Sequence, residues 1–158
     1  MEELMENVAE MLTENGLTVA TAESCTGGLI GDMLTSIPGS SAYYEGGVIS
    51  YSNALKQRFL NVTAETLERH GAVSEQTARE MAAGIRDAAE VDIGIATTGI
   101  AGPGGGTPEK PVGLVYIGLA SSGGVTVNRH VFDGSRRENK IATCRAALHM
   151  LREHVSHD

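Results

Sequence analysis

The stretch LTVATAESCTGG, residues 17–28, joins a strand to a helix and thereby decides the fold class of this chain. Residues 17–21 are rich in β-branched side chains and predict a short strand. From Cys25 to Ile37 the apolar residues recur at helical spacing, and a Pro-Gly pair closes the predicted helix. A strand that passes straight into a helix is the repeating unit of parallel α/β sheets.

The rest of the chain continues this alternation of strands and helices. The last two predicted strands flank a Ser-Ser-Gly-Gly turn and must pair antiparallel. The sequence therefore predicts an α/β fold: one three-layer α/β/α domain over residues 1–158, with a mixed, mostly parallel sheet of about five strands. Periodicity predicts the further helices over about residues 2–15, 54–60, 63–70, 74–89 and 135–154, and the further strands over about 43–51, 91–98, 112–120 and 125–132.

Composition excludes several classes of partner. The chain has 12 basic and 20 acidic residues, a net charge of −8, and 41% apolar residues, which suits a globular domain. Nucleic acids and anionic membranes are bound through cationic surfaces. We therefore expect no nucleic-acid partner and no membrane partner.

The two cysteines and the N-terminal residues indicate the cellular compartment of the protein. Cys25 and Cys144 fit free thiols in a reducing environment better than a disulfide framework. The acidic start MEELME has none of the charged-then-apolar layout of a signal peptide. No apolar run approaches the ~18 residues of a membrane span. These features predict a cytoplasmic protein.

Two possible nucleophiles, Ser24 and Cys25, stand at the predicted strand-to-helix junction. Side chains at a strand end are held rigidly, and the backbone N–H groups that open a helix can receive an anion or a developing oxyanion. The pattern equally allows a structural role, in which Ser24 or Thr26 caps the helix. The segment is no G-x-S-x-G nucleophile elbow, since Ala22 and Thr26 occupy the glycine positions.

Lys56 follows Tyr51-Ser52-Asn53 in the first turn of a predicted helix. A lysine there normally points into water, but a partly desolvated amine beside Ser24 can serve as the base for its hydroxyl. The spacing fits neither S-x-x-K nor Y-x-x-x-K, so the pattern leaves both possibilities open.

Residues 99–111 form a loop with five glycines and three prolines. The loop is long for a connection at the end of a buried strand, so it is either a mobile turn or a cover for a ligand. It is neither a Walker A loop nor a dinucleotide fingerprint, because Lys110 precedes a proline and a strand.

Arg136, Arg137 and Lys140 place three cations at the start of the last predicted helix, where the helix dipole favours anions. A bound phosphate would reverse this preference, and solvated surface charge is the other explanation. Helical periodicity favours Arg137 over Arg136 as the inward group. The five histidines form no cluster at metal-ligand spacing, so we expect no metal.

Together these segments resemble the C-terminal domain of the CinA (competence/damage-inducible) family. The similarity runs from about Leu4 to Val155. It comprises six ordered motifs, which are residues 21–28, Gly39-Ser40-Ser41, Tyr51-Ser52-Asn53 with Lys56, residues 70–74 (HGAVS), residues 99–103 (GIAGP) and residues 109–113 (EKPVG).

Members of this family include nicotinamide-nucleotide amidohydrolases. The resemblance therefore implies a hydrolase without metal or cofactor that converts nicotinamide mononucleotide to nicotinate mononucleotide and ammonia, as a homodimer or higher homo-oligomer. It implies Ser24 as the nucleophile, with assistance from Lys56 and Tyr51. The substrate contacts that it implies are Thr26, Gly27, Gly28, Thr98, Gly99, Gly102 and Arg136.

Two departures and two alternatives accompany the resemblance. The family often has Asp where this chain has Ser135, and often has Arg at Lys140, which lowers the expected contribution of Lys140 to phosphate binding. Cys25 is an alternative nucleophile, because a thiol at a helix N-terminus has a lowered pKa. A non-catalytic module that binds a nucleotide or a protein is the alternative to an enzyme.

Overall fold

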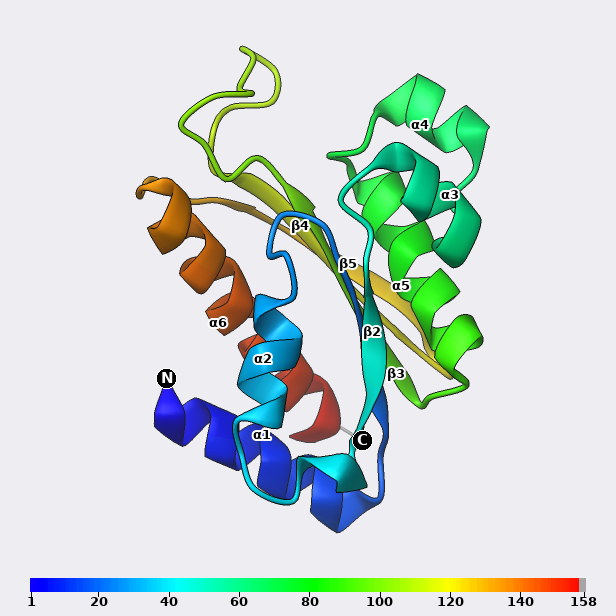
Figure 1. Ribbon diagram of the computed structural model, residues 1–158, viewed down its shortest axis with the longest axis vertical. Helices are drawn as coiled ribbons and strands as arrows, with labels where there is room; N and C mark the ends of the chain where they lie inside the picture. The colour runs from blue at the N-terminus through cyan, green and yellow to red at the C-terminus, as the bar shows by residue number, and fades with distance from the viewer. Residues whose placement is uncertain (157–158) are drawn as a thin grey trace.

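The computed structural model describes residues 1–156, in which one five-stranded sheet is covered by helices on both faces (Figure 1). The strand order is β2-β1-β3-β4-β5. The pairs β2–β1 and β1–β3 are parallel, and β3–β4 and β4–β5 are antiparallel. The strands are β1 (Val19–Glu23), β2 (Tyr44–Ile49), β3 (Ile93–Gly99), β4 (Leu114–Ser121) and β5 (Gly124–Val131). The α/β fold and the mixed sheet predicted from the sequence are confirmed.

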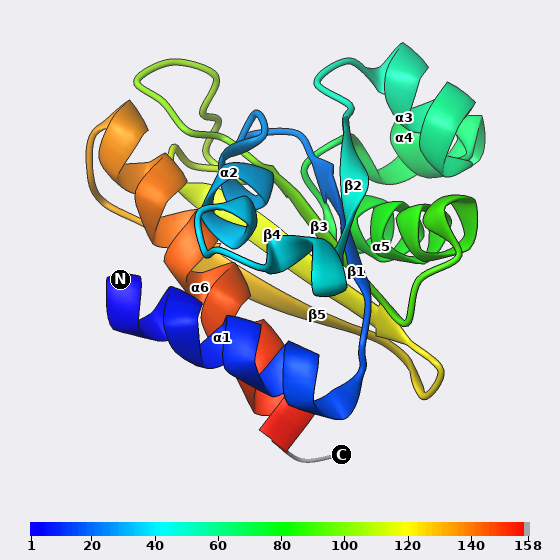
Figure 2. The same ribbon diagram turned by 60° about the horizontal axis from the view of Figure 1, so that its bottom comes forward.

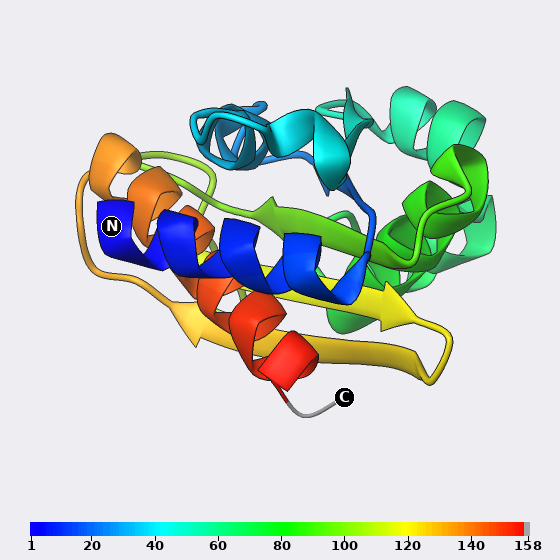
Figure 3. The same ribbon diagram turned by 90° about the horizontal axis from the view of Figure 1, so that it is seen from below.

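The helices form two layers, which Figures 2 and 3 show on opposite sides of the sheet. One layer contains α1 (Glu2–Asn15), α2 (Leu29–Thr35) and α6 (Arg136–Ser156), with the short helix η1 (Ser40–Ala42) after α2. The other contains α3 (Asn53–Leu60), α4 (Ala64–His70) and α5 (Glu75–Ala89). No helix within residues 1–156 is long and apolar enough to cross a membrane.

Each layer has its own apolar core. Under α1, α2 and α6 the core contains mainly Leu, Ile and Val side chains, whereas under α5 it contains small ones such as Ala20, Ala22 and Ala82. At Gly84 on α5 an added Cβ would overlap the carbonyl oxygen of Leu60, the last residue of α3. The small side chains of α5 thus let α3 lie close to it.

One predicted boundary was wrong. The helix expected from Cys25 begins at Leu29, because Gly27 and Gly28 have φ angles of 60° and 105° and residues 25–28 form a turn. Left-handed φ values of this kind are incompatible with the first turn of a helix. Ser24 therefore lies on a tight turn between β1 and α2.

The parallel strands determine where functional side chains gather. Ser24, Ser50 and Ile100 directly follow β1, β2 and β3, and the three strands end at the same edge of the sheet. Ligands of open α/β sheets bind in the crevice outside the carboxyl ends of such strands.

Candidate active site

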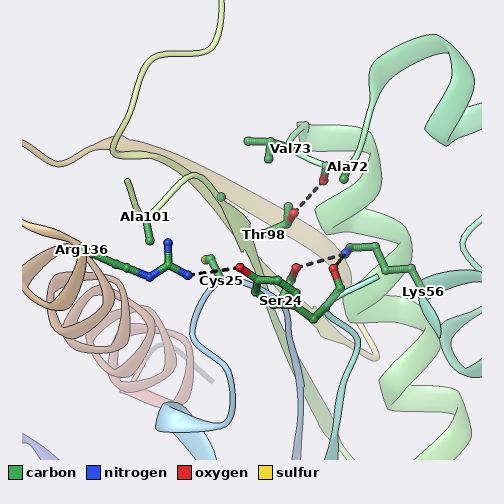
Figure 4. A pocket seen from close by; sticks show the side chains of 10 residues that line it. Ser24, Cys25, Lys56, Ala72, Val73, Thr98, Ala101 and Arg136 are labelled. Carbon is green, nitrogen blue, oxygen red and sulfur yellow. Dashed lines mark hydrogen bonds between the residues drawn. The ribbon is translucent and has the colours of Figure 1, made fainter. Parts of the chain in front are cut away.

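A cavity of about 160 Å³ opens at this edge of the sheet (Figure 4). Its lining combines hydroxyl, amine and guanidinium groups with a short apolar wall. Figure 4 shows Lys56 and Arg136 approaching Ser24 from opposite sides. The lining residues are Ser24, Cys25, Tyr51, Lys56, Ala72, Val73, Thr98, Gly99, Ala101 and Arg136.

Ser24 and Lys56 meet inside the cavity. Ser24 Oγ lies 3.0 Å from Lys56 Nζ, and the two residues are 7% and 1% exposed. Ser52 caps α3 by accepting a hydrogen bond from Leu55 N (3.2 Å), which fixes the turn that carries Lys56. Lys56 is therefore buried toward Ser24, although a lysine at this position normally points into water.

Backbone carbonyl groups hold the amine in place. Lys56 Nζ also donates to the carbonyl oxygens of Ser50 (2.8 Å) and Tyr51 (3.3 Å). No carboxylate forms an ion pair with it: the described residues contain two ion pairs, both on exposed helix surfaces. Burial therefore lowers the pKa of Lys56, and the opposing electrostatic effect of Cys25 is smaller.

Cys25 lies in a different environment from Ser24. Burial raises the pKa of its thiol to about 11, and the nearby Glu23 carboxylate adds to this shift. The lowered pKa expected for a thiol at a helix N-terminus is wrong here, because the helix begins four residues later. Cys25 is therefore a protonated thiol at neutral pH, and Ser24 is the hydroxyl that faces the amine.

Glu23 stabilises the turn that follows Ser24, and the sequence analysis did not single this residue out. Its buried carboxylate accepts hydrogen bonds from Thr26 Oγ1 (2.7 Å) and from the backbone N–H groups of Ile30 (2.9 Å) and Gly31 (3.0 Å). Thr26 Oγ1 also bonds to Thr97 Oγ1 (2.9 Å). The first turn of α2 is thus occupied by Glu23 and is not an open anion site.

The predicted contacts at Thr26, Gly27 and Gly28 are not in the cavity lining. The Thr26 side chain is buried in the Glu23 network, and Gly27 N–H donates to the carbonyl of Ser24 (3.2 Å). Gly28 borders a separate hollow beside Ile49. Within residues 1–156 the backbone N–H of Thr26 donates to no protein acceptor.

Arg136 closes the outer end of the cavity. Its guanidinium donates to the carbonyl oxygen of Gly102 (2.8 Å) and to the hydroxyl of Tyr51 (3.2 Å). Tyr51 is 64% exposed, so its hydroxyl is at the rim and its carbonyl, not its ring, contacts Lys56. Arg137 does not line the cavity, so the preference from helical periodicity was wrong and Arg136 is the inward group.

The remaining wall comes from β3 and its loop. Thr98 Oγ1 donates to the carbonyl of Ala72 (2.7 Å), which fixes the segment that carries the apolar groups Ala72 and Val73. Asn139, fully buried on α6, donates to the carbonyl of Ala101 (3.0 Å) and anchors the loop. The sequence analysis included Ala72, Val73 and Ala101 in family motifs without giving them a role, and it did not single out Asn139. In the described part of the chain no three His, Cys, Asp or Glu side chains gather as a metal site.

Comparison with known proteins identifies relatives over nearly the whole chain. Residues 1–155 match the CinA C-terminal domain. CinA-like proteins from Syntrophotalea carbinolica and Chlorobaculum tepidum are 51% identical over 154 residues and 54% identical over 150 residues. These alignments cover 98% and 92% of this chain but 37% and 36% of the relatives, so the chain spans little more than a third of their length.

Solved structures agree in fold. A CinA superfamily protein from Klebsiella pneumoniae is 38% identical, with a TM-score of 0.96 and coverage of 99% of this chain and 98% of that chain. The competence/damage inducible protein CihA from Agrobacterium tumefaciens is 48% identical, with a TM-score of 0.90 and coverage of 95% and 92%. The chain belongs to the CinA C-terminal domain family.

Proposed function

We propose that this protein hydrolyses the carboxamide of nicotinamide mononucleotide to nicotinate mononucleotide and ammonia, with Ser24 as nucleophile and Lys56 as base. The observation that carries the proposal is the 3.0 Å contact between Ser24 Oγ and a buried lysine amine that has no carboxylate partner. A hydroxyl becomes a competent nucleophile when an adjacent group of suitable pKa accepts its proton.

The carbonyl groups around Lys56 explain how the amine acts as a base. A neutral amine has two N–H donors and one lone pair. The carbonyl oxygens of Ser50 and Tyr51 accept the two N–H groups, which directs the lone pair at the hydroxyl proton of Ser24. Burial lowers the pKa of Lys56 and thereby shifts the equilibrium toward this neutral form.

The reaction then follows in two stages. Ser24 Oγ bonds to the carboxamide carbon, its proton passes to Lys56, and the carbonyl electron pair forms an oxyanion near the backbone N–H groups of Cys25 and Thr26. When the intermediate collapses, the C–N bond breaks and Lys56 protonates the departing nitrogen to give ammonia. Water attacks the resulting ester, Lys56 takes the proton of the water, and Ser24 leaves with that proton.

The shape and charge of the cavity support a pyridine nucleotide as substrate. The small apolar groups Ala72, Val73 and Ala101 offer a surface for a flat ring beside Ser24. Arg136 supplies a cation at the outer end, where a phosphate linked to that ring would lie. The net charge of −8 makes this local cation a specific feature rather than part of a basic surface.

Ammonia release from nicotinamide mononucleotide tests the proposal. We expect release by the wild-type protein and its loss in Ser24→Ala, with Ser122→Ala, an exposed serine of the β4–β5 turn, as the matched control. Normal turnover by Ser24→Ala would rule out the assignment of the nucleophile. A folded wild-type protein that is stabilised by the nucleotide in a thermal shift but releases no ammonia would instead be a binding module.

A further inference from the structure

Ser50 has a buried hydroxyl without a hydrogen-bond partner. The residue is 0% exposed, and its Oγ is the one buried side-chain polar atom within residues 1–156 for which the structure gives no partner. An unpaired buried hydroxyl is destabilising, because nothing replaces the hydrogen bonds that it made with water. Such an exception in a native structure requires an explanation.

The sheet places this hydroxyl beside the nucleophile. In the parallel pair β1–β2, Ala22 pairs with Val48 and Glu23 with Ile49, so the next step of the register sets Ser24 beside Ser50. The Ser50 N–H donates to the carbonyl of Glu23 (2.9 Å), which continues the ladder to this point.

The two hydroxyls also share one face of the sheet. Ala22 and Val48 pack in the core under α5, and side chains two residues further along a strand return to the same face. Ser24 and Ser50 therefore project toward the layer of α3 and α5, from which Lys56 extends. Lys56 Nζ touches both residues, at Ser24 Oγ (3.0 Å) and at the carbonyl oxygen of Ser50 (2.8 Å).

The proposed reaction changes the hydrogen bonding of Lys56. In the free enzyme the three oxygen atoms Ser24 Oγ, Ser50 O and Tyr51 O surround Nζ. Once Ser24 is acylated, its Oγ becomes an ester oxygen, which accepts hydrogen bonds weakly and has no proton to give. Lys56 then lacks its third partner until water attacks. The Ser50 hydroxyl can accept an N–H of the neutral amine in place of the longer contact to the Tyr51 carbonyl (3.3 Å), which leaves the lone pair free to take the proton of water.

We infer that Ser50 is a positioning residue that takes the place of Ser24 as partner of Lys56 while Ser24 is acylated. Its hydroxyl holds Nζ next to the acyl carbon between the loss of ammonia and the attack of water. Ser50 forms no covalent bond and makes no net proton transfer. The inference rests on the acyl-enzyme of the proposed function, but not on the identity of the acyl group.

The prediction is selective for the second stage of the reaction. Ser50→Ala leaves the Ser24–Lys56 contact intact, so acylation keeps its rate within about threefold. Deacylation slows by roughly fivefold to tenfold, because the neutral Lys56 amine loses one hydrogen bond that orients its lone pair. Ser50→Thr keeps the hydroxyl and restores deacylation.

Pre-steady-state hydrolysis of p-nitrophenyl acetate separates the two stages, because its leaving group needs no protonation. We expect Ser50→Ala to show the wild-type burst and a slow steady state, with acetyl-Ser24 accumulating in the mass spectrum of the intact protein. Ser122→Ala is the control for loss of a serine hydroxyl, and circular dichroism verifies the fold of each variant.

Several outcomes would overturn the inference. One is a steady-state rate of Ser50→Ala equal to that of the wild type. Another is an equal fall in the burst rate and the steady-state rate. A third is a Ser50→Thr variant that deacylates as slowly as Ser50→Ala. A wild-type protein that hydrolyses nicotinamide mononucleotide without an acyl-Ser24 would refute this inference and the role of Ser24 as nucleophile, and would leave only the proposed substrate and products. An ester burst without ammonia release from the nucleotide would refute the proposed substrate, and the ester data would still decide the role of Ser50.

Discussion

The inner and outer ends of the cavity are built in different ways. At the inner end Ser24 and Lys56 are almost fully buried and are held by backbone carbonyl groups and by the Glu23 network. At the outer end Arg136 and Tyr51 are exposed and hold each other through a single side-chain hydrogen bond. The inner end is fixed before substrate arrives, as bond-making requires, whereas the outer end can adjust to the part of the substrate that does not react.

The largest effect should come from the amine of the inner end. Lys56→Met keeps an unbranched side chain but removes the proton acceptor, and we expect kcat to fall by roughly a hundredfold to ten-thousandfold. Steady-state ammonia release measures it. Arg69→Met, an exposed position on α4, is the matched control and should retain full activity. If kcat of Lys56→Met stayed within tenfold of the wild-type value, Lys56 would not be the base, and the inner end would not differ from the outer end in carrying the chemistry.

The pH profile sharpens the role of the same amine. Burial lowers the pKa of Lys56, and the base acts in its neutral form, so kcat/KM should rise with pH until that lowered pKa is passed. Below this point the rate should fall about tenfold per pH unit. The stability of the fold should follow the same sign: the unfolded chain binds the extra proton between the folded and unfolded pKa values, so wild type gains stability relative to Lys56→Met as pH rises through that window. A flat difference in the free energy of unfolding would contradict the assignment.

At the outer end the loss should appear in binding. Arg136→Met removes a charge-assisted contact to the phosphate, and we expect KM to rise roughly tenfold to a hundredfold with little change in kcat. The matched control is Arg137→Met, the neighbouring arginine that does not line the cavity, which should change KM by less than about twofold. A loss of kcat at constant KM would show that the outer end takes part in the chemistry.

Glu23→Gln tests whether the inner end is rigid because of its carboxylate. The amide provides one acceptor oxygen in place of two, so one of the N–H groups of Ile30 and Gly31 loses its partner. We expect a loss of about 1–2 kcal/mol in the free energy of unfolding, measured by urea denaturation. An unchanged midpoint would mean that the turn is held by its glycines rather than by Glu23.

The smallest effect is expected for the tyrosine. The Tyr51 hydroxyl contacts Arg136, and the Tyr51 carbonyl contacts Lys56, so removing the hydroxyl leaves the base intact. Tyr51→Phe should change kcat by less than about threefold and raise KM slightly, since an exposed hydrogen bond contributes little. A large fall in kcat would place the hydroxyl in the proton path and would join the two ends of the cavity into one unit.

The sequence predicted the fold well because its signals are local. Alternation of apolar residues, the caps at Ser52 and Ser74 and the turn before β5 determine elements whose order already limits the topology. The family resemblance predicted ten site residues. The cavity lining contains six of them, Ser24, Tyr51, Lys56, Thr98, Gly99 and Arg136, and lacks Thr26, Gly27, Gly28 and Gly102.

What the sequence could not provide depends on side-chain direction. Glu23 and Thr26 were not distinguishable from surface residues or simple caps, because their hydrogen bonds depend on the left-handed turn at Gly27. Helical periodicity favoured Arg137, whereas the family resemblance implied Arg136, and Arg136 is the one that lines the cavity. The sequence analysis did not predict a role for Ser50, because it lies in a predicted strand and comes beside Ser24 only through the pairing of β1 with β2.

The close approach of α3 and α5 at Gly84 has a consequence for anyone who wishes to transplant this chemistry. Lys56 lies on α3, so the position of α3 determines the position of its amine. α3 can pack this close to α5 only because Gly84 has no Cβ that would overlap the Leu60 carbonyl oxygen. A graft that copied only the serine and the lysine into another α/β scaffold would leave the amine out of reach. A working graft would need the two strand ends, both helices and a glycine at the position of Gly84, where a Cβ would push the helices apart.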